Sequence, residues 1–188
     1  MRLESCRTII DSFSPNNILV IQIETSGPDV NTDRILRLAA CSMNGDQIIA
    51  TNSISEEAAE IERIINGYNV IIGVDVFDKL IPFLNKSGIV INSSIAADLQ
   101  NEWNEIIGVY NSNTKEWYEI SLASLAGTFR FQPHPELYSH EYNKVMAYSF
   151  LAEKAADFGT ITLRTNRRTQ YQIYRRAQNN LNKEHTSF

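Results

Sequence analysis

The stretch Ile18-Leu19-Val20-Ile21-Gln22-Ile23-Glu24-Thr25-Ser26-Gly27 of this 188-residue chain combines an apolar run with a polar end. Its first six residues are nearly all apolar and mostly β-branched, which predicts a strand buried on both faces of a sheet. Side chains two residues apart lie on one face of a strand, so Gln22 and Glu24 share a face where this strand ends. A carboxylate there is placed to hold a divalent cation beside a phosphate. A solvated strand end is the simpler interpretation of the same pattern.

The segments that follow predict a mixed α/β layout around this strand. Residues 34–43 are rich in apolar side chains, Asn44-Gly45 is typical of a hairpin turn, and residues 47–54 form the returning strand. These three strands are therefore expected to be antiparallel neighbours. Two further strands alternate with helices, which is typical of a central sheet with helices on both faces. We expect those two strands at 70–74 and 89–91. One helix should begin after the N-cap Ser55, and others should span 77–87, 95–107, 121–129, 136–158 and 170–182. Residues 1–16 should form a short lead-in before the first strand.

Composition excludes several classes of protein. Hydrophobic residues make up 43% of the chain and charged residues 21%, as in ordinary globular domains. No apolar run reaches 18 residues, so we expect no membrane partner. Cys6 and Cys41 are too few for a disulfide framework and lack the spacing of zinc ligands. Residues 1–7 do not resemble the start of a signal peptide. This feature and the low cysteine count predict a cytoplasmic location.

Charge is distributed unevenly along the chain. Residues 160–188 carry six basic residues and one acidic residue, a net charge of +5, whereas the rest carries 11 basic and 21 acidic residues, a net charge of −10. We therefore divide the chain into a domain over 1–160 and a basic helical tail over 161–188. The tail either docks on the acidic body or on a second subunit, or it binds nucleic-acid phosphates. The residues for the second role are Arg167, Arg168, Arg175 and Arg176.

The end of the first strand and the segments after it follow a recognisable order. They read Gln22-Ile23-Glu24-Thr25-Ser26-Gly27, then Asp33-Arg34-Ile35, then Asn44-Gly45. This order resembles the first motif of the ribonuclease-H-like 3′–5′ exonucleases, the Asp-Glu-Asp-Asp family with a histidine base (DEDDh type). The resemblance implies a ribonuclease-H-like mixed sheet, with Glu24 as a metal ligand and with Thr25 and Ser26 beside nucleic acid. The family's leading aspartate is replaced by Gln22.

Two later segments extend the resemblance over about 140 residues. The strand and helix at 71–89 are similar to the family's second motif, in which an aspartate binds metal; one register gives that position to Asp78 and the other gives it to Leu80. The family's His-Asn pair is missing in both registers. The helix after Leu122-Ala123-Ser124-Leu125-Ala126 is similar to the third motif. There His140 takes the place of the general base, and Val145 takes the place of the last metal-binding aspartate.

The resemblance implies a reaction that these residues supply only in part. The family uses two Mg²⁺ or Mn²⁺ ions held by four carboxylates, which activate water and stabilise the leaving oxygen. Here Gln22 offers a neutral oxygen and Val145 offers none. We therefore expect an exonuclease-like domain that is catalytically impaired, needs no metal if the site is degenerate, and binds single-stranded nucleic acid or a protein partner. The alternatives are an active metal-dependent exonuclease in which another acid, such as Asp29, Asp98 or Glu141, completes the site, and a protein-interaction module on the same fold.

Overall fold

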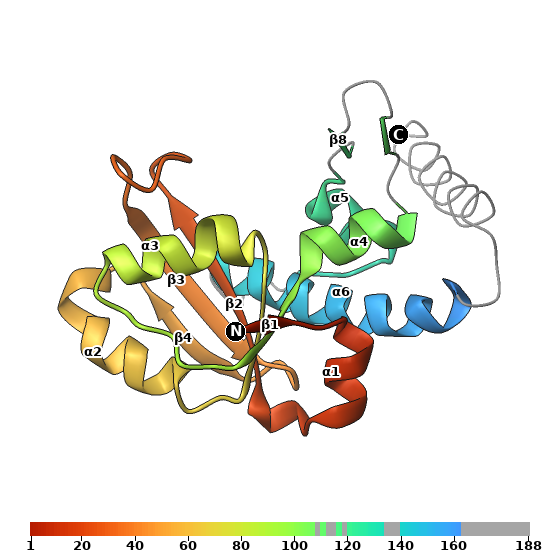
Figure 1. Ribbon diagram of the computed structural model, residues 1–188, viewed down its shortest axis with the longest axis horizontal. Coiled ribbons are helices and arrows are strands. Elements are labelled where there is room, and N and C mark those ends of the chain that lie inside the picture. The colour runs from red at the N-terminus through yellow and green to blue at the C-terminus, as the bar shows by residue number, and fades with distance from the viewer. Residues whose placement is uncertain (108–109, 112–115, 118–119, 134–139, 163–188) are drawn as a thin grey trace.

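The computed structural model describes residues 1–107, 110–111, 116–117, 120–133 and 140–162 (Figure 1). Its main sheet has six strands in the order β1-β6-β5-β2-β3-β4, with β2 inside the sheet. A second sheet pairs two short strands, β7 and β8. The strands are β1 (Arg2–Leu3), β2 (Ile18–Thr25), β3 (Ile35–Ser42), β4 (Gln47–Thr51), β5 (Val70–Gly73), β6 (Ile95–Asp98), β7 (Tyr110–Asn111) and β8 (Glu116–Trp117).

The sheet is mixed, as the sequence predicts. β2, β3 and β4 form an antiparallel meander, and Gly45 in the turn between β3 and β4 adopts a φ of 84° that favours glycine. On the other side of β2, the strands β5, β6 and β1 are added in parallel. The expected three antiparallel strands with parallel additions are therefore confirmed.

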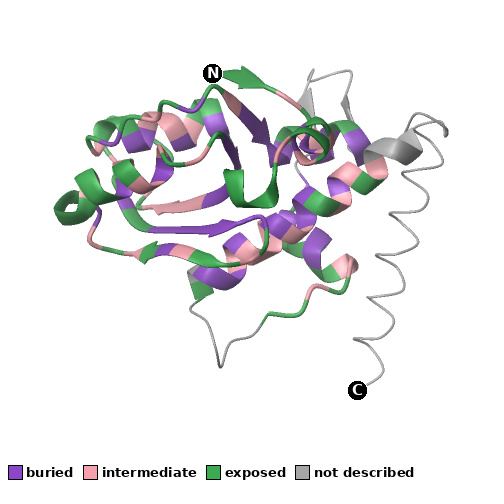
Figure 2. Ribbon diagram, turned by 90° about the horizontal axis from the view of Figure 1, so that it is seen from below, coloured by how far each residue is buried: buried purple, intermediate pink, exposed green. Residues whose placement is uncertain are grey.

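Helices cover both faces of this sheet (Figures 1 and 2). Alternate residues of β2 enter two separate cores: Ile18 and Val20 pack with α1, α4, α5 and α6, whereas Leu19 and Ile21 pack with α2, η2 and α3. This two-sided burial explains the nearly continuous apolar run of β2. The helical segments are α1 (Cys6–Ser12), η1 (Pro15–Asn17), α2 (Ile54–Ile65), η2 (Val76–Leu80), α3 (Ile81–Lys86), α4 (Leu99–Ile107), α5 (Leu122–Thr128) and α6 (His140–Thr162).

The expected strand at 89–91 is wrong, because the side chains of Glu62 in α2 and of Asn66, the residue that caps its C-terminus, satisfy the backbone there. Val90 N–H donates to Glu62, Asn66 Nδ2 donates to Val90 O, and Asn92 N–H donates to Asn66 Oδ1. The parallel strand forms instead at Ile95–Asp98, where a helix was expected to begin. The remainder of that expected helix is α4, from Leu99 to Ile107.

Three other boundaries differ from expectation. The lead-in over 1–16 contains β1 and α1, since Ser5 caps α1 by accepting from Thr8 N–H while Cys6 and Ile9 are fully buried. Helix α2 begins after Ser53 rather than after Ser55. Helix α6 continues through Gly159 to Thr162. The expected helix at 170–182 and the four tail arginines lie outside the described residues.

None of the described helices is both long and apolar enough to cross a membrane.

Candidate functional site

The candidate site lies where three neighbouring parallel strands end. β6, β5 and β2 are adjacent in the sheet and run in the same direction, so their carboxyl ends meet at one edge. Acidic residues stand at or just after each end: Glu24 on β2, Asp75 after β5 and Asp98 on β6. Ligands of open α/β sheets commonly bind at this edge, which makes it the first place to examine for chemistry.

Gln22 and Glu24 share one face of β2, as their spacing predicts. Gln22 lies opposite Ala39 of β3, and Glu24 lies opposite Arg37. Because Val20 and Ala39 belong to the core beneath α6, this face of β2 is the one that α6 covers. Gln22 Nε2 donates to the carbonyl of Ile23 at 2.8 Å. That bond directs Gln22 Oε1 away from the backbone as an acceptor.

Two oxygen atoms on this face are buried without a hydrogen bond. They are Gln22 Oε1 and Glu24 Oε2. A buried acceptor without a donor carries a desolvation cost of about 1–3 kcal/mol. Both atoms are therefore suited to a ligand that supplies positive charge or hydrogen-bond donors.

The cation nearest to the Glu24 carboxylate in the described contacts is a side chain of the protein itself. Arg37 Nη1 lies 3.8 Å from Glu24 Oε2, with 51% of the Arg37 side chain and 38% of the Glu24 side chain exposed. Two unit charges about 4 Å apart near a protein surface interact by about 4 kcal/mol, and solvent around such half-exposed groups lowers this value. A divalent cation at Glu24 would meet repulsion from Arg37 of the same kind. The described residues also contain no group of three or more His, Cys, Asp or Glu side chains that could hold a metal ion.

Asp98 joins the ends of β5 and β6 rather than facing solvent. It is 6% exposed, and its carboxylate accepts from Val76 N–H at 2.8 Å and from Asn101 N–H at 3.1 Å. The first bond holds the start of η2, and the second lies in the first turn of α4. Both carboxylate oxygens therefore have structural partners. Asp29, another acid considered for a completed site, accepts from the N–H of Asn31 within its own loop.

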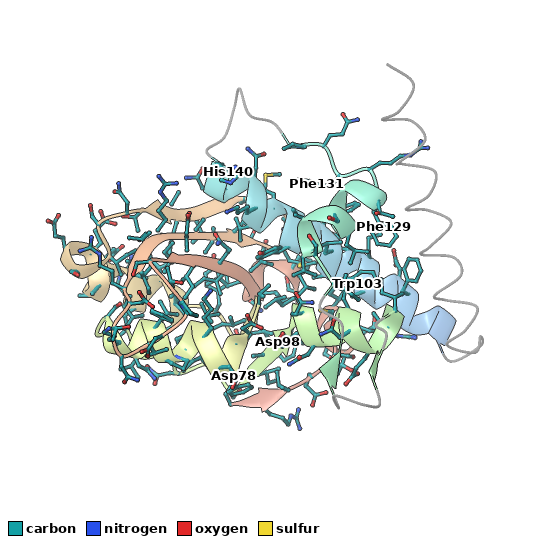
Figure 3. All side chains as sticks on the ribbon, turned by 90° about the horizontal axis from the view of Figure 1, so that it is seen from above. Asp78, Asp98, Trp103, Phe129, Phe131 and His140 are labelled. Carbon is teal, nitrogen blue, oxygen red and sulfur yellow. The ribbon has the colours of Figure 1, made fainter. Side chains whose placement is uncertain are left out.

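The second-motif candidates lie on η2, after β5. Asp78 is exposed, whereas Leu80 is buried in the core under α2 and α3, on the opposite face of the sheet from Gln22 and Glu24. A Cβ atom on Gly73 would lie 2.8 Å from Leu80 Cδ2, so Leu80 packs directly on the end of β5. Figure 3 shows Asp78 near Asp98. Neither candidate is joined to Glu24 by a described contact.

The third-motif candidates lie on α6, and the structure separates them from Asp78. Figure 3 shows His140, which is exposed, on the opposite side of the domain from Asp78 and Asp98. Tyr142, in the same first turn, donates to the carbonyl of Gly45 in the β3–β4 turn. That turn lies beyond the end of β3, whereas Arg37 lies near its start. The contacts described for the start of α6 thus go to the opposite end of β3 from the Glu24–Arg37 pair.

Val145 and Tyr148 are further along α6. Val145 is fully buried, and its carbonyl accepts from Cys41 Sγ at 3.7 Å. Tyr148 is half-buried; burial raises its pKa, and the negative charge of Asp75 raises it further. Asp75 follows β5 in the left-handed conformation, with a φ of 50° that is uncommon for aspartate. Asp75 at the strand ends therefore acts electrostatically on Tyr148 of α6.

The loop after Glu24 is closed by its own side chains. Ser26 Oγ donates to Asp33 Oδ1, and Lys86 Nζ at the end of α3 donates to the carbonyls of Asn31 and Asp33. A Cβ atom on Gly27 would lie 2.4 Å from Asp33 Oδ2, so a larger residue there would displace the Asp33 side chain from its present position. Ser26 is consequently engaged within the loop, while Thr25 ends β2 at a register shift.

Sequence reasoning did not single out Arg37 or Tyr148. A signal for Arg37 was present, because it is the only charged residue in the apolar run Ile35–Ser42. Its pairing with Glu24 depends on the β2–β3 register, which the sequence does not state. Tyr148 carries no such signal, since an aromatic residue in a long helix is ordinary.

Comparisons with known proteins add no family to this geometry. None of the models of known protein families matches the chain, and a search of curated proteins finds no relative for it.

Proposed function

We propose that this chain is a ribonuclease-H-like domain of the 3′–5′ exonuclease type whose metal site is degenerate, and that it binds single-stranded nucleic acid without cutting it efficiently. The observation that carries the proposal is the position of Gln22 and Glu24 at the carboxyl end of β2, the strand that begins the meander and also pairs in parallel with β5. The motif resemblance expects its polar pair at that place in this topology.

The composition of the site supports impaired catalysis. Two-metal hydrolysis needs several anionic oxygens to neutralise two divalent cations. Among the side chains described on this face of β2, Glu24 supplies a carboxylate, Gln22 is neutral, and Arg37 adds positive charge. Val145 lies in the apolar core, and both oxygens of Asp98 already accept backbone N–H groups. The residues described at the site fit a pair of Mg²⁺ or Mn²⁺ ions poorly.

We expect the purified chain to degrade single-stranded DNA and RNA with Mn²⁺ no faster than its Glu24→Gln variant. Calorimetric titration should likewise give the same weak Mn²⁺ affinity for both proteins. Glu57→Gln, at an exposed position of α2, is the matched control for loss of one carboxylate. Cleavage that is robust in the wild type and lost in Glu24→Gln would overturn the proposal in favour of an active nuclease with a rearranged site.

A gain-of-function variant tests the same site independently. Gln22→Asp places a second carboxylate on the face that Glu24 occupies. If this face descends from a metal site, Mn²⁺ affinity should rise by about tenfold or more for the added charge. An unchanged affinity in a folded Gln22→Asp protein would contradict that origin.

A further inference from the structure

We propose that Asn44, in the turn between β3 and β4, is a site of spontaneous deamidation, and that its conversion to isoaspartate loosens the start of α6. The inference is independent of the proposed function. The chain contains two Asn-Gly sequences, Asn44-Gly45 and Asn66-Gly67. The asparagine amide is chemically labile, above all before glycine, where no side chain hinders attack by the next backbone nitrogen. The two sequences therefore form a matched pair with the same local chemistry.

Deamidation is an intramolecular reaction followed by hydrolysis. The backbone nitrogen of Gly45 loses its proton to a base in solution and attacks the side-chain carbonyl carbon Cγ of Asn44. The new N–Cγ bond closes a five-membered succinimide ring, the Cγ–Nδ2 bond breaks, and ammonia leaves with a proton from solvent. Water then opens the ring at either carbonyl carbon, which gives aspartate or isoaspartate. The fold controls the rate through how readily the asparagine side chain reaches the next nitrogen.

The attacking nitrogen is held in the same way at both sites. Gly45 N–H donates to Ser42 O at 2.9 Å, and Gly67 N–H donates to Ile64 O at 3.0 Å. Each nitrogen must therefore give up one backbone hydrogen bond before it can react. Because this requirement is common to the two sites, a difference in their rates has to come from the asparagine side chains.

The side-chain contacts separate the two asparagines. Asn66 is half-buried; its Nδ2 donates to Val90 O and its Oδ1 accepts from Asn92 N–H, both at 2.8 Å. Asn44 is exposed, and its Nδ2 donates at 2.7 Å to Oδ1 of Asn16, which is exposed as well. Water competes for a hydrogen bond between two exposed side chains, so the Asn44 amide leaves its position more readily than the Asn66 amide.

The turn that contains Asn44 also holds the start of α6. Tyr142, in the first turn of α6, donates to the carbonyl of Gly45. Isoaspartate at position 44 routes the chain through the side-chain carbon, so it adds one methylene group to the backbone before Gly45 and leaves a negative charge in the turn. Gly45 can then no longer keep both its place in the turn and its contact with Tyr142. We therefore expect the first turns of α6 to open more often in the isoaspartyl form.

The test incubates the folded chain in mildly alkaline buffer and follows each site by peptide mapping with mass spectrometry. We expect Asn44 to deamidate about tenfold faster than Asn66, the factor for one additional hydrogen bond at Asn66. In the chain unfolded by urea the two rates should be similar, which isolates the effect of the fold. Asn16→Ala should speed deamidation of Asn44 alone. Glu62→Ala removes the acceptor of Val90 N–H and should speed deamidation of Asn66 alone.

Equal rates at the two sites in the folded chain, or a faster rate at Asn66, would overturn the assignment of Asn44. Glu57→Ala removes an exposed carboxylate from the same helix as Glu62 and should leave both rates unchanged. An equal acceleration of Asn66 by both variants would refute the protection through Glu62. Hydrogen exchange of the isoaspartyl form, separated by chromatography, measures the effect on α6. We expect faster exchange at residues 142–148 than in the unmodified chain, and unchanged exchange there would refute the loosening of α6.

Discussion

A hydrogen bond to the Glu102 side chain joins α1 to α4. Glu102 lies on α4, and its Oε2 accepts from Cys6 N–H at the start of α1, at 2.7 Å and across 96 residues of sequence. A carboxylate at a helix N-terminus interacts favourably with the unpaired N–H groups there. Burial nevertheless raises the pKa of Glu102 above its ordinary value, while the hydrogen bonds from Cys6 lower it. The net direction is upward, so the folded chain holds a proton on Glu102 more readily than the unfolded chain.

This shift predicts how stability depends on pH. Because the pKa of Glu102 is higher in the folded state, its contribution to the free energy of unfolding is complete below the unfolded value of 4.5 and is lost as pH rises through the folded pKa. Glu102→Gln should remove that dependence. We expect the free energy of unfolding of the wild type to fall relative to that of Glu102→Gln as pH rises from 4.5 towards neutrality. Urea denaturation at several pH values measures it, and a pH-independent difference would contradict the assignment.

Val145 is a second residue at which a substitution should change the stability of the fold. Its side chain is fully buried among apolar residues of α1, α4 and the sheet, so a carboxylate there would have no solvent and no cation in the core cluster. Val145→Asp should destabilise the fold by about 3–5 kcal/mol, whereas Val145→Ala should cost about 2 kcal/mol for its cavity. Chemical denaturation of both variants provides the comparison. A Val145→Asp protein as stable as Val145→Ala would show that this position reaches solvent or a cation.

Residue spacing predicted the face of the candidate site but not its contacts. The period of two in a strand was enough to place Gln22 and Glu24 together, because that relation is local. Arg37 reaches Glu24 only through the pairing of β2 with β3, and Asp98 reaches Val76 only through the pairing of β6 with β5. Such contacts depend on register, which composition and periodicity do not determine.

At the scale of elements, Asp98 connects a strand end to two helical segments. It accepts from Val76 N–H in η2 and Asn101 N–H in α4 while almost fully buried. We expect Asp98→Ala to lower the free energy of unfolding by about 3 kcal/mol, because two buried N–H donors lose a charged acceptor. Asp98→Asn should cost about half as much, since the amide oxygen still accepts one bond.

Thermal and urea unfolding of the two Asp98 variants measures this ranking. Asp78→Ala, at an exposed position on η2, is the matched control and should change stability by less than about 0.5 kcal/mol. Asp98→Ala and Asp78→Ala with equal stability would show that the Asp98 bonds contribute nothing to folding.

Elements were predictable where a local signal marks them. Asn44-Gly45 gave the β3–β4 turn, and Ser121 gave the start of α5, because the turn and the cap are properties of adjacent residues. The strand expected at 89–91 failed for the opposite reason. Ile89-Val90-Ile91 has the composition of a strand, but Glu62 of a distant helix and Asn66 at the C-terminal cap of that helix take its backbone hydrogen bonds. Tertiary partners overrode β propensity there.

At the scale of the whole molecule, the order of the strands was more predictable than the arrangement of the site. A hairpin meander followed by alternating helices and strands leaves few sheet topologies, because parallel crossovers follow a strong handedness rule. The motif resemblance implies that Glu24 and His140 belong to one site, and no such topological rule constrains their distance. His140 lies on the opposite side of the domain from Asp98 (Figure 3). The role expected for the four tail arginines remains a prediction, since they lie outside the described residues.

The parallel pairing of β1 with β6 imposes an order on folding during synthesis. Arg2 N–H donates to Ser94 O and Glu4 N–H donates to Ala96 O, so β1, which precedes the other strands of this sheet in the chain, finds its partner only after most of the sheet has been made. A ribosome adds about 5–20 residues per second, so several seconds pass between the synthesis of β1 and that of β6. Cys6 and Ile9 of α1 are fully buried in the finished domain, so the burial of these two side chains also waits for later parts of the chain. The β1 edge of the sheet therefore forms only after β6 has been made, although β1 comes before every other strand of that sheet in the chain.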